Sequence, residues 1–207
     1  FQAGVAMTTG VQNTIVGAQA GDALTTGTGN VALGYSALGA EDAHGKNTAI
    51  GYNALLVQDA GADGYNTAVG YTAGIAISTG VRNSLLGYAG RAISTGSENV
   101  AVGYLAMSAG TTGGKNVAIG HSALSTQSVT GSSVNAMRNV AVGFAAQSSV
   151  TTGFYNVSLG YQAGDDITDG QRNICIGHDA DINSGNNQHT IVIGESITAA
   201  SNDFSFG

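Results

Sequence analysis

Proline and tryptophan are absent from this 207-residue sequence, and cysteine occurs only once. A single cysteine excludes an internal disulfide and any zinc site made of several cysteines, so we expect Cys175, within an apolar stretch, to be a buried small hydrophobe. Lysine and arginine together number six. This scarcity argues against nucleic acid as a partner, because phosphate binding needs a basic surface. No apolar run is long enough (about 18 residues) to cross a membrane, so we expect no membrane insertion.

Charged residues are also scarce, at 9% of the chain, against about 25% in typical globular proteins. Together with 33 glycines, this could indicate a low-complexity chain without a packed core. The hydrophobic content of 43% and the net charge of only −7 argue for a folded protein instead.

A five-residue word recurs along the whole chain: Asn, any residue, a small or apolar residue, then Val, Ile or Leu, and finally Gly. Seven of the ten intervals between successive copies are 17 residues long, and the others are 16, 19 and 23. Thr190 takes the Asn position in the eleventh copy, and the segment 203–207 reads as a twelfth with Asp203 there. The Asn positions are Asn13, Asn30, Asn47, Asn66, Asn83, Asn99, Asn116, Asn139, Asn156 and Asn173, and the glycines are Gly17, Gly34, Gly51, Gly70, Gly87, Gly103, Gly120, Gly143, Gly160, Gly177 and Gly194.

Each copy predicts a short β-strand, because a β-branched run lies between Gly and Asn. Seventeen residues accommodate two short strands and two turns, which is one rung of a β-solenoid. We therefore predict an all-β fold, a parallel β-solenoid of about eleven 17-residue coils, as a single repeat domain over residues 1–207. Apolar residues on both strand faces suggest burial on both sides, and we expect motif aliphatics such as Val102, Ile119 and Val142 to stack in one buried column.

Other positions recur in the same frame. An aromatic ring or His follows most motif glycines, as at Tyr35 and Tyr161, and Ala lies two residues further on, as at Ala37 and Ala163. In register, the rings would form an aromatic column and the Asn side chains a hydrogen-bonded ladder. The chain starts just after an expected motif glycine and stops on one, so we expect a segment of a longer fibre, with uncapped terminal rungs.

These words resemble the head repeats of YadA-like trimeric autotransporter adhesins, whose consensus is close to Asn-Ser-Val-Ala-Ile-Gly; the segment 116–120 is nearly that word. They also resemble the repetitive shafts of phage tail fibres, which carry Gly-Tyr-x-Ala-Leu and Gly-Tyr-x-Ala-Gly words like those at 51–55 and 160–164. The resemblance covers essentially the whole chain, although the adhesin repeat is shorter. It implies a left-handed β-roll, a parallel homotrimer and surface attachment, and it supplies no catalytic residues.

No catalytic, cofactor-binding or metal-binding residues are predicted, and we expect no cofactor and no enzymatic activity. The acidic turn with Asp165, Asp166 and Asp169 could hold Ca²⁺, although a solvated turn is the simpler interpretation. The best candidate for a specific contact is the six-residue insertion within 125–137, because solenoids push insertions outward. The candidate contact residues in this loop are Ser125, Gln127, Ser132 and Asn135.

The leading functional prediction is a structural one: an extracellular fibre segment, shaft or head, of a viral tail fibre or a bacterial surface adhesin. Its partner would be itself, as a homotrimer or an end-to-end filament. The alternative is a module that binds cell-surface glycans along the solenoid side. A minor alternative is an ice-binding solenoid, since Thr-Thr turns recur at 25–26, 111–112 and 151–152.

Overall fold

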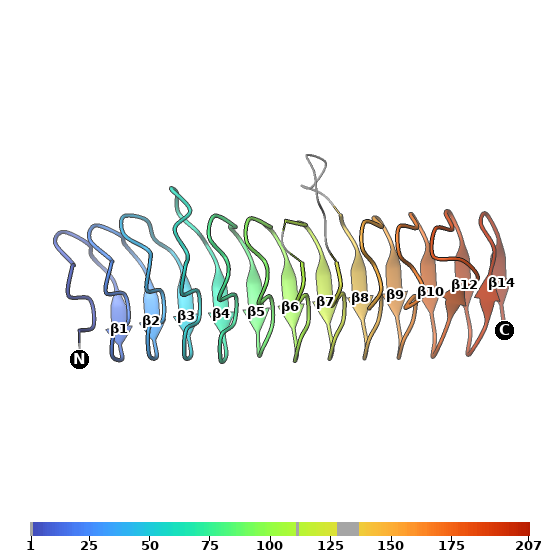
Figure 1. Ribbon diagram of the computed structural model, residues 1–207, viewed down its shortest axis with the longest axis horizontal. Coiled ribbons are helices and arrows are strands. Elements are labelled where there is room, and N and C mark those ends of the chain that lie inside the picture. The colour runs from blue at the N-terminus through green and yellow to red at the C-terminus, as the bar shows by residue number, and fades with distance from the viewer. Residues whose placement is uncertain (1, 111, 128–136) are drawn as a thin grey trace.

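A computed structural model describes residues 2–110, 112–127 and 137–207 and shows the predicted parallel β-solenoid. The coils stack side by side into one straight rod with the two ends of the chain at opposite tips (Figure 1), and the described residues contain no helix. The strands are β1 Thr14–Val16, β2 Val31–Leu33, β3 Thr48–Ile50, β4 Thr67–Val69, β5 Ser84–Leu86, β6 Val100–Val102, β7 Val117–Ile119, β8 Val140–Val142, β9 Val157–Leu159, β10 Ile174–Ile176, β11 Asp181–Ile182, β12 Ile191–Ile193, β13 Thr198–Ala199 and β14 Phe204–Phe206.

Twelve of these strands form one parallel sheet in sequence order, from β1 to β10 and then β12 and β14, while β11 pairs with β13. The strand of the twelfth motif copy therefore joins the sheet, with Phe204 opposite Ile191. Register is kept even where the interval changes: Thr48 lies opposite Thr67 across the 19-residue interval, and Val117 opposite Val140 across the 23-residue one. The extra residues of the 19-residue interval lie in the loop between β3 and β4, which rises above its neighbours (Figure 1).

The expectation of two strands in each coil is wrong for most coils, whose second side consists of turns. The reason is a recurring left-handed backbone. In the turns after β3, for example, Asn53 and Leu55 have φ of 53° and 50°. Lys46, which directly precedes the motif residue Asn47 and β3, has φ of 63°. Left-handed residues that alternate with right-handed ones cannot continue a strand. The turns are nevertheless bound to the next coil, as by the Leu55 amide, which donates to the Ala73 carbonyl at 3.1 Å.

The interior is narrow and is filled mainly by small residues. The middle residue of each strand points inward, as Ala101, Ala118 and Ala141 do with no exposed surface, and the recurring alanines of the turns meet them from the other side. The prediction that Val102, Ile119 and Val142 form a buried column is therefore wrong for the single chain: they lie on the outer face, and Ile119 is 39% exposed. Period-two alternation separates the two faces correctly, but the narrow coil accommodates alanine inside and larger aliphatics outside.

The motif glycines form the corner after each strand, with φ between 93° and 149°. A Cβ built on Gly34 would lie 2.4 Å from the Gly51 carbonyl oxygen of the next coil, so successive corners approach too closely for any side chain.

The motif asparagines form a hydrogen-bonded column along the rod. The backbone N–H of each Asn donates to the side-chain Oδ1 of the Asn one coil earlier, at 2.9 to 3.1 Å, and Thr190 continues the series by donating to Asn173. In eight of the ten, the Asn Nδ2 also donates to a turn carbonyl of the following coil. The exceptions, Asn47 and Asn116, precede the two longest intervals: Asn47 Nδ2 has no partner in the described chain, and Asn116 Nδ2 donates to Gln127.

Candidate functional site

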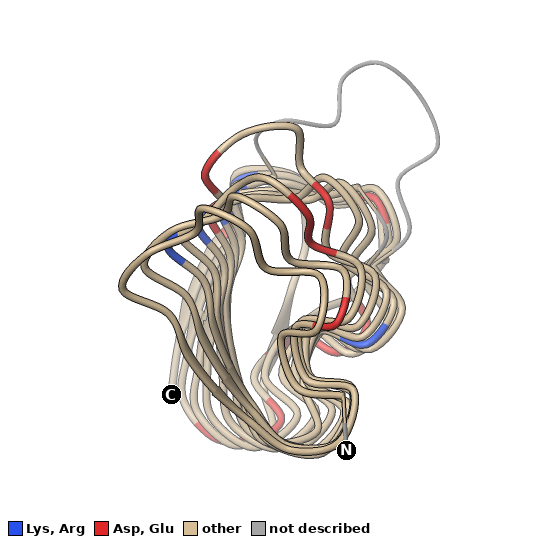
Figure 2. Ribbon diagram, turned by 90° about the vertical axis from the view of Figure 1, so that its left-hand side faces the viewer, with Lys and Arg blue, Asp and Glu red and all other residues tan. Residues whose placement is uncertain are grey.

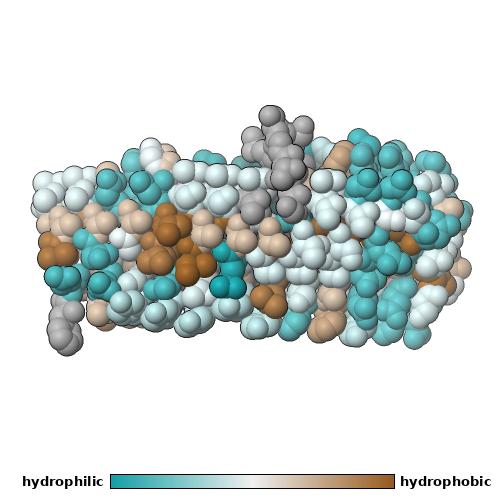
Figure 3. Space-filling view, viewed as in Figure 1, coloured by the Kyte–Doolittle hydropathy of each residue, from teal (hydrophilic) through white to brown (hydrophobic). Residues whose placement is uncertain are grey.

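The outer face of the twelve-stranded sheet carries a continuous apolar strip. We define the outer apolar strip as the first and third residues of these strands, which are mostly Val, Ile and Leu and are half-buried or exposed throughout. Leu33, Leu86 and Leu159 are 43%, 50% and 49% exposed. By contrast, the side of the rod seen in Figure 3 shows hydrophobic residues only in separate areas, among pale and hydrophilic ones. The strip is therefore an apolar surface that the repeat itself extends from coil to coil.

An aromatic column runs along one edge of the strip, one residue beyond the motif glycines. Neighbouring rings stack with centroids 4.9 to 6.2 Å apart, and most pairs are within 17° of parallel. Because each ring covers the face of the next, the column presents ring edges and hydroxyls to solvent instead of ring faces. Its members are Tyr35, Tyr52, Tyr71, Tyr88, Tyr104, His121, Phe144, Tyr161 and His178.

A basic column runs along the opposite edge, at the left-handed position immediately before each motif Asn. Five of the six basic side chains of the sequence occupy it, and all five are exposed. Sequence reasoning missed this column, although the repeat alignment contains the signal. The members are Lys46, Arg82, Lys115, Arg138 and Arg172.

The cations of the basic column have partners on adjacent coils. Lys46 pairs with Asp63 at 2.6 Å, and this contact lowers the pKa of the Asp63 carboxyl. Arg82 and Lys115 each lie 4.0 Å from Glu98.

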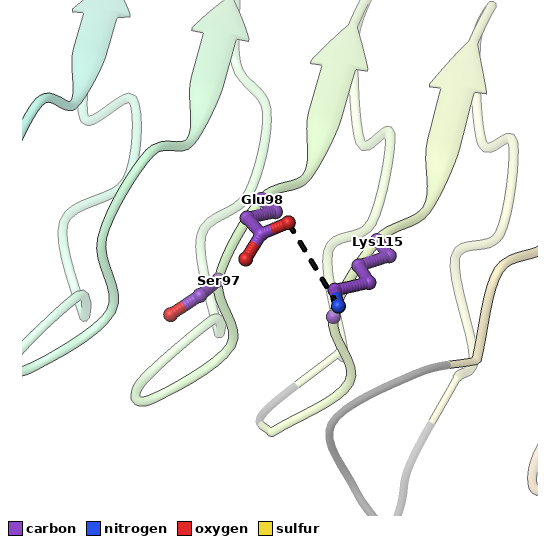
Figure 4. Close-up of a pocket in the computed structure, with 4 residues that line it drawn as sticks. Ser97, Glu98 and Lys115 are labelled. Carbon is purple, nitrogen blue, oxygen red and sulfur yellow. Dashed lines mark ion pairs between the residues drawn. The ribbon is translucent and has the colours of Figure 1, made fainter.

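A recess of about 270 Å³ lies beside this column, lined by Ser97, Glu98, Gly114 and Lys115 (Figure 4). Its two charged side chains face each other across adjacent coils at 4.0 Å. The Gly114-Lys115 pair is part of a turn between coils, with no helix N-terminus behind it in the described residues, so it lacks the usual setting of a phosphate loop. The recess is a small polar pocket that presents a hydroxyl, a carboxylate and an ammonium group.

The predicted contact loop is only partly described. Ser132 and Asn135 lie outside the described residues. Ser125 is half-buried, and its carbonyl accepts a hydrogen bond from the Ala109 amide. Gln127 is fully buried, and its Oε1 accepts from Asn116 Nδ2 at 3.1 Å, so the prediction that it faces a partner is wrong. Its side-chain oxygen takes the role that a turn carbonyl has for most of the motif asparagines, as for Asn99 with Gly113.

Two of the three aspartates considered as a Ca²⁺ turn do come together, but with a different third residue. Asp165 and Asp166 group with Asp181, whereas Asp169 does not belong to the cluster. Burial, and then a hydrogen bond with Asp165, raises the pKa of Asp181 to about 8. A carboxylic acid that keeps its proton near neutral pH accounts for this close contact without a bound cation.

Cys175 is fully buried in β10, and burial raises the pKa of its thiol to about 12. It is therefore an unreactive thiol at neutral pH.

A second group of ligand-type side chains was not anticipated. Glu41, Asp42, His44 and Asp59, which we call the acidic cluster, place one carboxylate oxygen or ring nitrogen each within 4.8 Å of all the others. Glu41 is fully buried, while Asp42 and Asp59 are exposed. The end-on view shows that Asp and Glu lie at several places around the perimeter of the coils (Figure 2).

The chain matches no family model, no curated protein and no solved structure. Among the described residues there is no helix long and apolar enough to cross a membrane.

Proposed function

We propose that this chain is a structural fibre segment, shaft or head, of an extracellular viral tail fibre or bacterial surface adhesin, and that three copies associate side by side through the outer apolar strip. The observation that carries the proposal is the strip itself, which every coil extends in the same direction. A rod built from one repeated coil, with its polar groups engaged in inter-coil hydrogen bonds, is suited to spacing and presentation.

The size of the strip supports self-association. Twelve strands spaced by about 4.8 Å and about 10 Å wide give on the order of 500 Å² in plan. The largest apolar patch on a typical monomeric protein covers about 300–600 Å² and is often functional, so a strip of this size is compatible with a contact surface. The two flanking columns widen the surface toward the roughly 800 Å² per partner that stable interfaces bury.

Sedimentation equilibrium at micromolar concentration tests the assembly. A particle three times the 20.5 kDa chain mass is expected, and a stable monomer would contradict the trimer. Immunogold labelling with antibodies against the chain tests the location: label along fibres of virions or on the bacterial surface is expected, and label confined to the cell interior would contradict the proposed function.

Glycan binding along the side stays an alternative prediction. The stacked rings of the aromatic column favour it little, because their faces, on which sugars stack, are covered by neighbouring rings. A glycan array separates the two functions: specific binding that survives disruption of the strip would favour the lectin, and no binding favours the spacer.

A further inference from the structure

The acidic cluster interrupts two columns of the repeat. Glu41 occupies the interior position that Leu24 holds one coil earlier, Gln58 one coil later and Ile77 two coils later, so this mainly aliphatic column is polar at two successive coils. Asp42 and Asp59 occupy one position on successive coils, where Thr25 precedes them and Ser78 follows. An aliphatic position thus holds a carboxylate, and a hydroxyl column holds two stacked aspartates, at the same place on the rod. Like charges stacked on neighbouring strands or turns repel each other.

The interior carboxylate is not satisfied by the protein. Glu41 Oε1 accepts a hydrogen bond from the His44 backbone N–H at 3.0 Å and lies 3.5 Å from His44 Nδ1. Glu41 Oε2 is buried and has no hydrogen-bond partner among the described residues, and the same holds for His44 Nδ1. An unpaired buried carboxylate oxygen is costly, and this one belongs to a group whose other ligand atoms lie within 4.8 Å. The nearby cation Lys46 is already engaged by Asp63 at 2.6 Å and by the Tyr65 hydroxyl at 3.0 Å.

We propose that Glu41, Asp42, His44 and Asp59 bind a divalent transition-metal ion of the Zn²⁺ type. One imidazole nitrogen with carboxylate oxygens is a donor set that favours such ions over Ca²⁺ or Mg²⁺, which prefer oxygen alone. Ligand atoms about 2.1 Å from a tetrahedral ion lie about 3.4 Å apart, so small side-chain rotations convert the observed grouping into a coordination shell.

The backbone around the site is already held in place. The Asp42 carbonyl accepts from the Thr25 amide at 2.6 Å, the His44 carbonyl accepts from Asn30 Nδ2 at 3.2 Å, and the Asp59 amide donates to the Ser78 carbonyl at 2.8 Å. These bonds fix the ligands to two adjoining coils. The ion would tie the coil after β2 to the raised loop between β3 and β4, where the 19-residue interval leaves Asn47 Nδ2 and Gln58 Nε2 without partners in the described chain.

The repeat supplies matched variants for the test. Glu41→Leu and Asp59→Ser each install the residue that a neighbouring coil carries at the same position, so the coil tolerates them, and His44→Ala removes the imidazole. Full-length chain is stripped with a chelator and titrated with ZnCl₂ by calorimetry. We expect one Zn²⁺ per chain, a thermal midpoint that rises with Zn²⁺, and a loss of affinity of about tenfold or more in each variant.

Glu98→Gln, an acid on the rod surface outside the cluster, is the control and should bind Zn²⁺ as the unmodified chain does. Circular dichroism in chelator verifies that each variant is folded. Co²⁺ should give the visible absorption of a site of low coordination number, and His44→Ala should abolish it. Absence of Zn²⁺ binding at 100 μM would overturn the proposal. It would also be overturned if Glu41→Leu and Asp59→Ser bound Zn²⁺ with the same affinity as the unmodified chain. Binding of Ca²⁺ but not Zn²⁺, unchanged by His44→Ala, would overturn the transition-metal assignment.

Discussion

Two adjacent residues of β7 distinguish the inner from the outer face of the sheet. Ala118 is fully buried between Ala101 and Ala141, its register partners, whereas Ile119 lies on the outer apolar strip and is 39% exposed. We expect Ala118→Asp to prevent folding of the surrounding coils. An unpaired carboxylate in the interior costs at least several kcal/mol, and its extra volume adds about 1–3 kcal/mol of overpacking.

Ile119→Asp should have a much smaller effect on a single chain. Full burial of an isoleucine side chain contributes about 1.5–3 kcal/mol. Because Ile119 is only a little more than half buried, its replacement should lower the free energy of unfolding by about 1–2 kcal/mol. In a trimer, however, the same substitution places three carboxylates in one interface. It should therefore dissociate the assembly while leaving folded monomers.

Circular dichroism melts and sedimentation velocity separate these effects. Ala118→Asp should reduce the β signal near room temperature, because the coils around β7 unfold, and Ile119→Asp should keep the signal while the sedimentation coefficient falls to that of the monomer. An unchanged thermal midpoint in Ala118→Asp would refute the strand orientation. If Ile119→Asp unfolded the chain as severely as Ala118→Asp, Ile119 could not lie on an outer face that the single chain does not need for folding. Ser84→Thr, on the outer face of β5, is the control and should change neither measurement.

Three further substitutions test the corner, the ladder and the buried acid. Gly34→Ala should lower the thermal midpoint strongly, because φ of 137° is unfavourable for alanine and the new Cβ would meet the Gly51 carbonyl; an unchanged midpoint would contradict the close corner. Asn99→Ala should cost about 2–4 kcal/mol in denaturant melts, since the Asn116 amide and the Gly113 carbonyl each lose a buried bond of 3.0 Å; a loss below about 0.5 kcal/mol would refute the ladder. Asp181→Asn should flatten the pH dependence of the free energy of unfolding. The pKa of Asp181 is near 8 in the folded state and near 3.9 in the unfolded state. The protonated acid therefore stabilises the folded state fully below about pH 4, and this stabilisation falls by up to about 1.4 kcal/mol per pH unit between about pH 4 and 8. A wild-type chain whose stability is constant over that range would disagree with the raised pKa.

The repeat frame could be predicted from sequence because its constraints are local and are repeated in every coil. The close corner requires Gly and the ladder requires Asn. The Asn and the Gly of each copy therefore keep the same separation, even where the turns between copies lengthen. Which strand face is inside could not be derived from alternation alone, since Val100 and Ala101 are both apolar. The recurring alanines contained the answer, because alanine is the commonest residue on the inner face of the strands and on the turns that pack against it.

The acidic cluster was missed for a different reason. Asp42 and Asp59 are 17 residues apart and become neighbours only when coils are superimposed, and Glu41 is exceptional only beside Leu24 and Ile77. Column-by-column comparison of coils would have found them. Gln127 illustrates the opposite limit, because it is buried in a 23-residue coil, whose length no neighbouring coil shares.

The inter-coil hydrogen bonds of the sheet and of the asparagine column all run along the rod, and each coil contacts only its neighbours. Under axial tension these bonds are links in series, so every junction carries the full load and the weakest one yields first. Bending loads the same junctions unevenly, because it stretches the inter-coil bonds on the convex side and compresses those on the concave side. A bundle of three rods would divide the tensile load at every junction, so that one ruptured link need not sever the fibre.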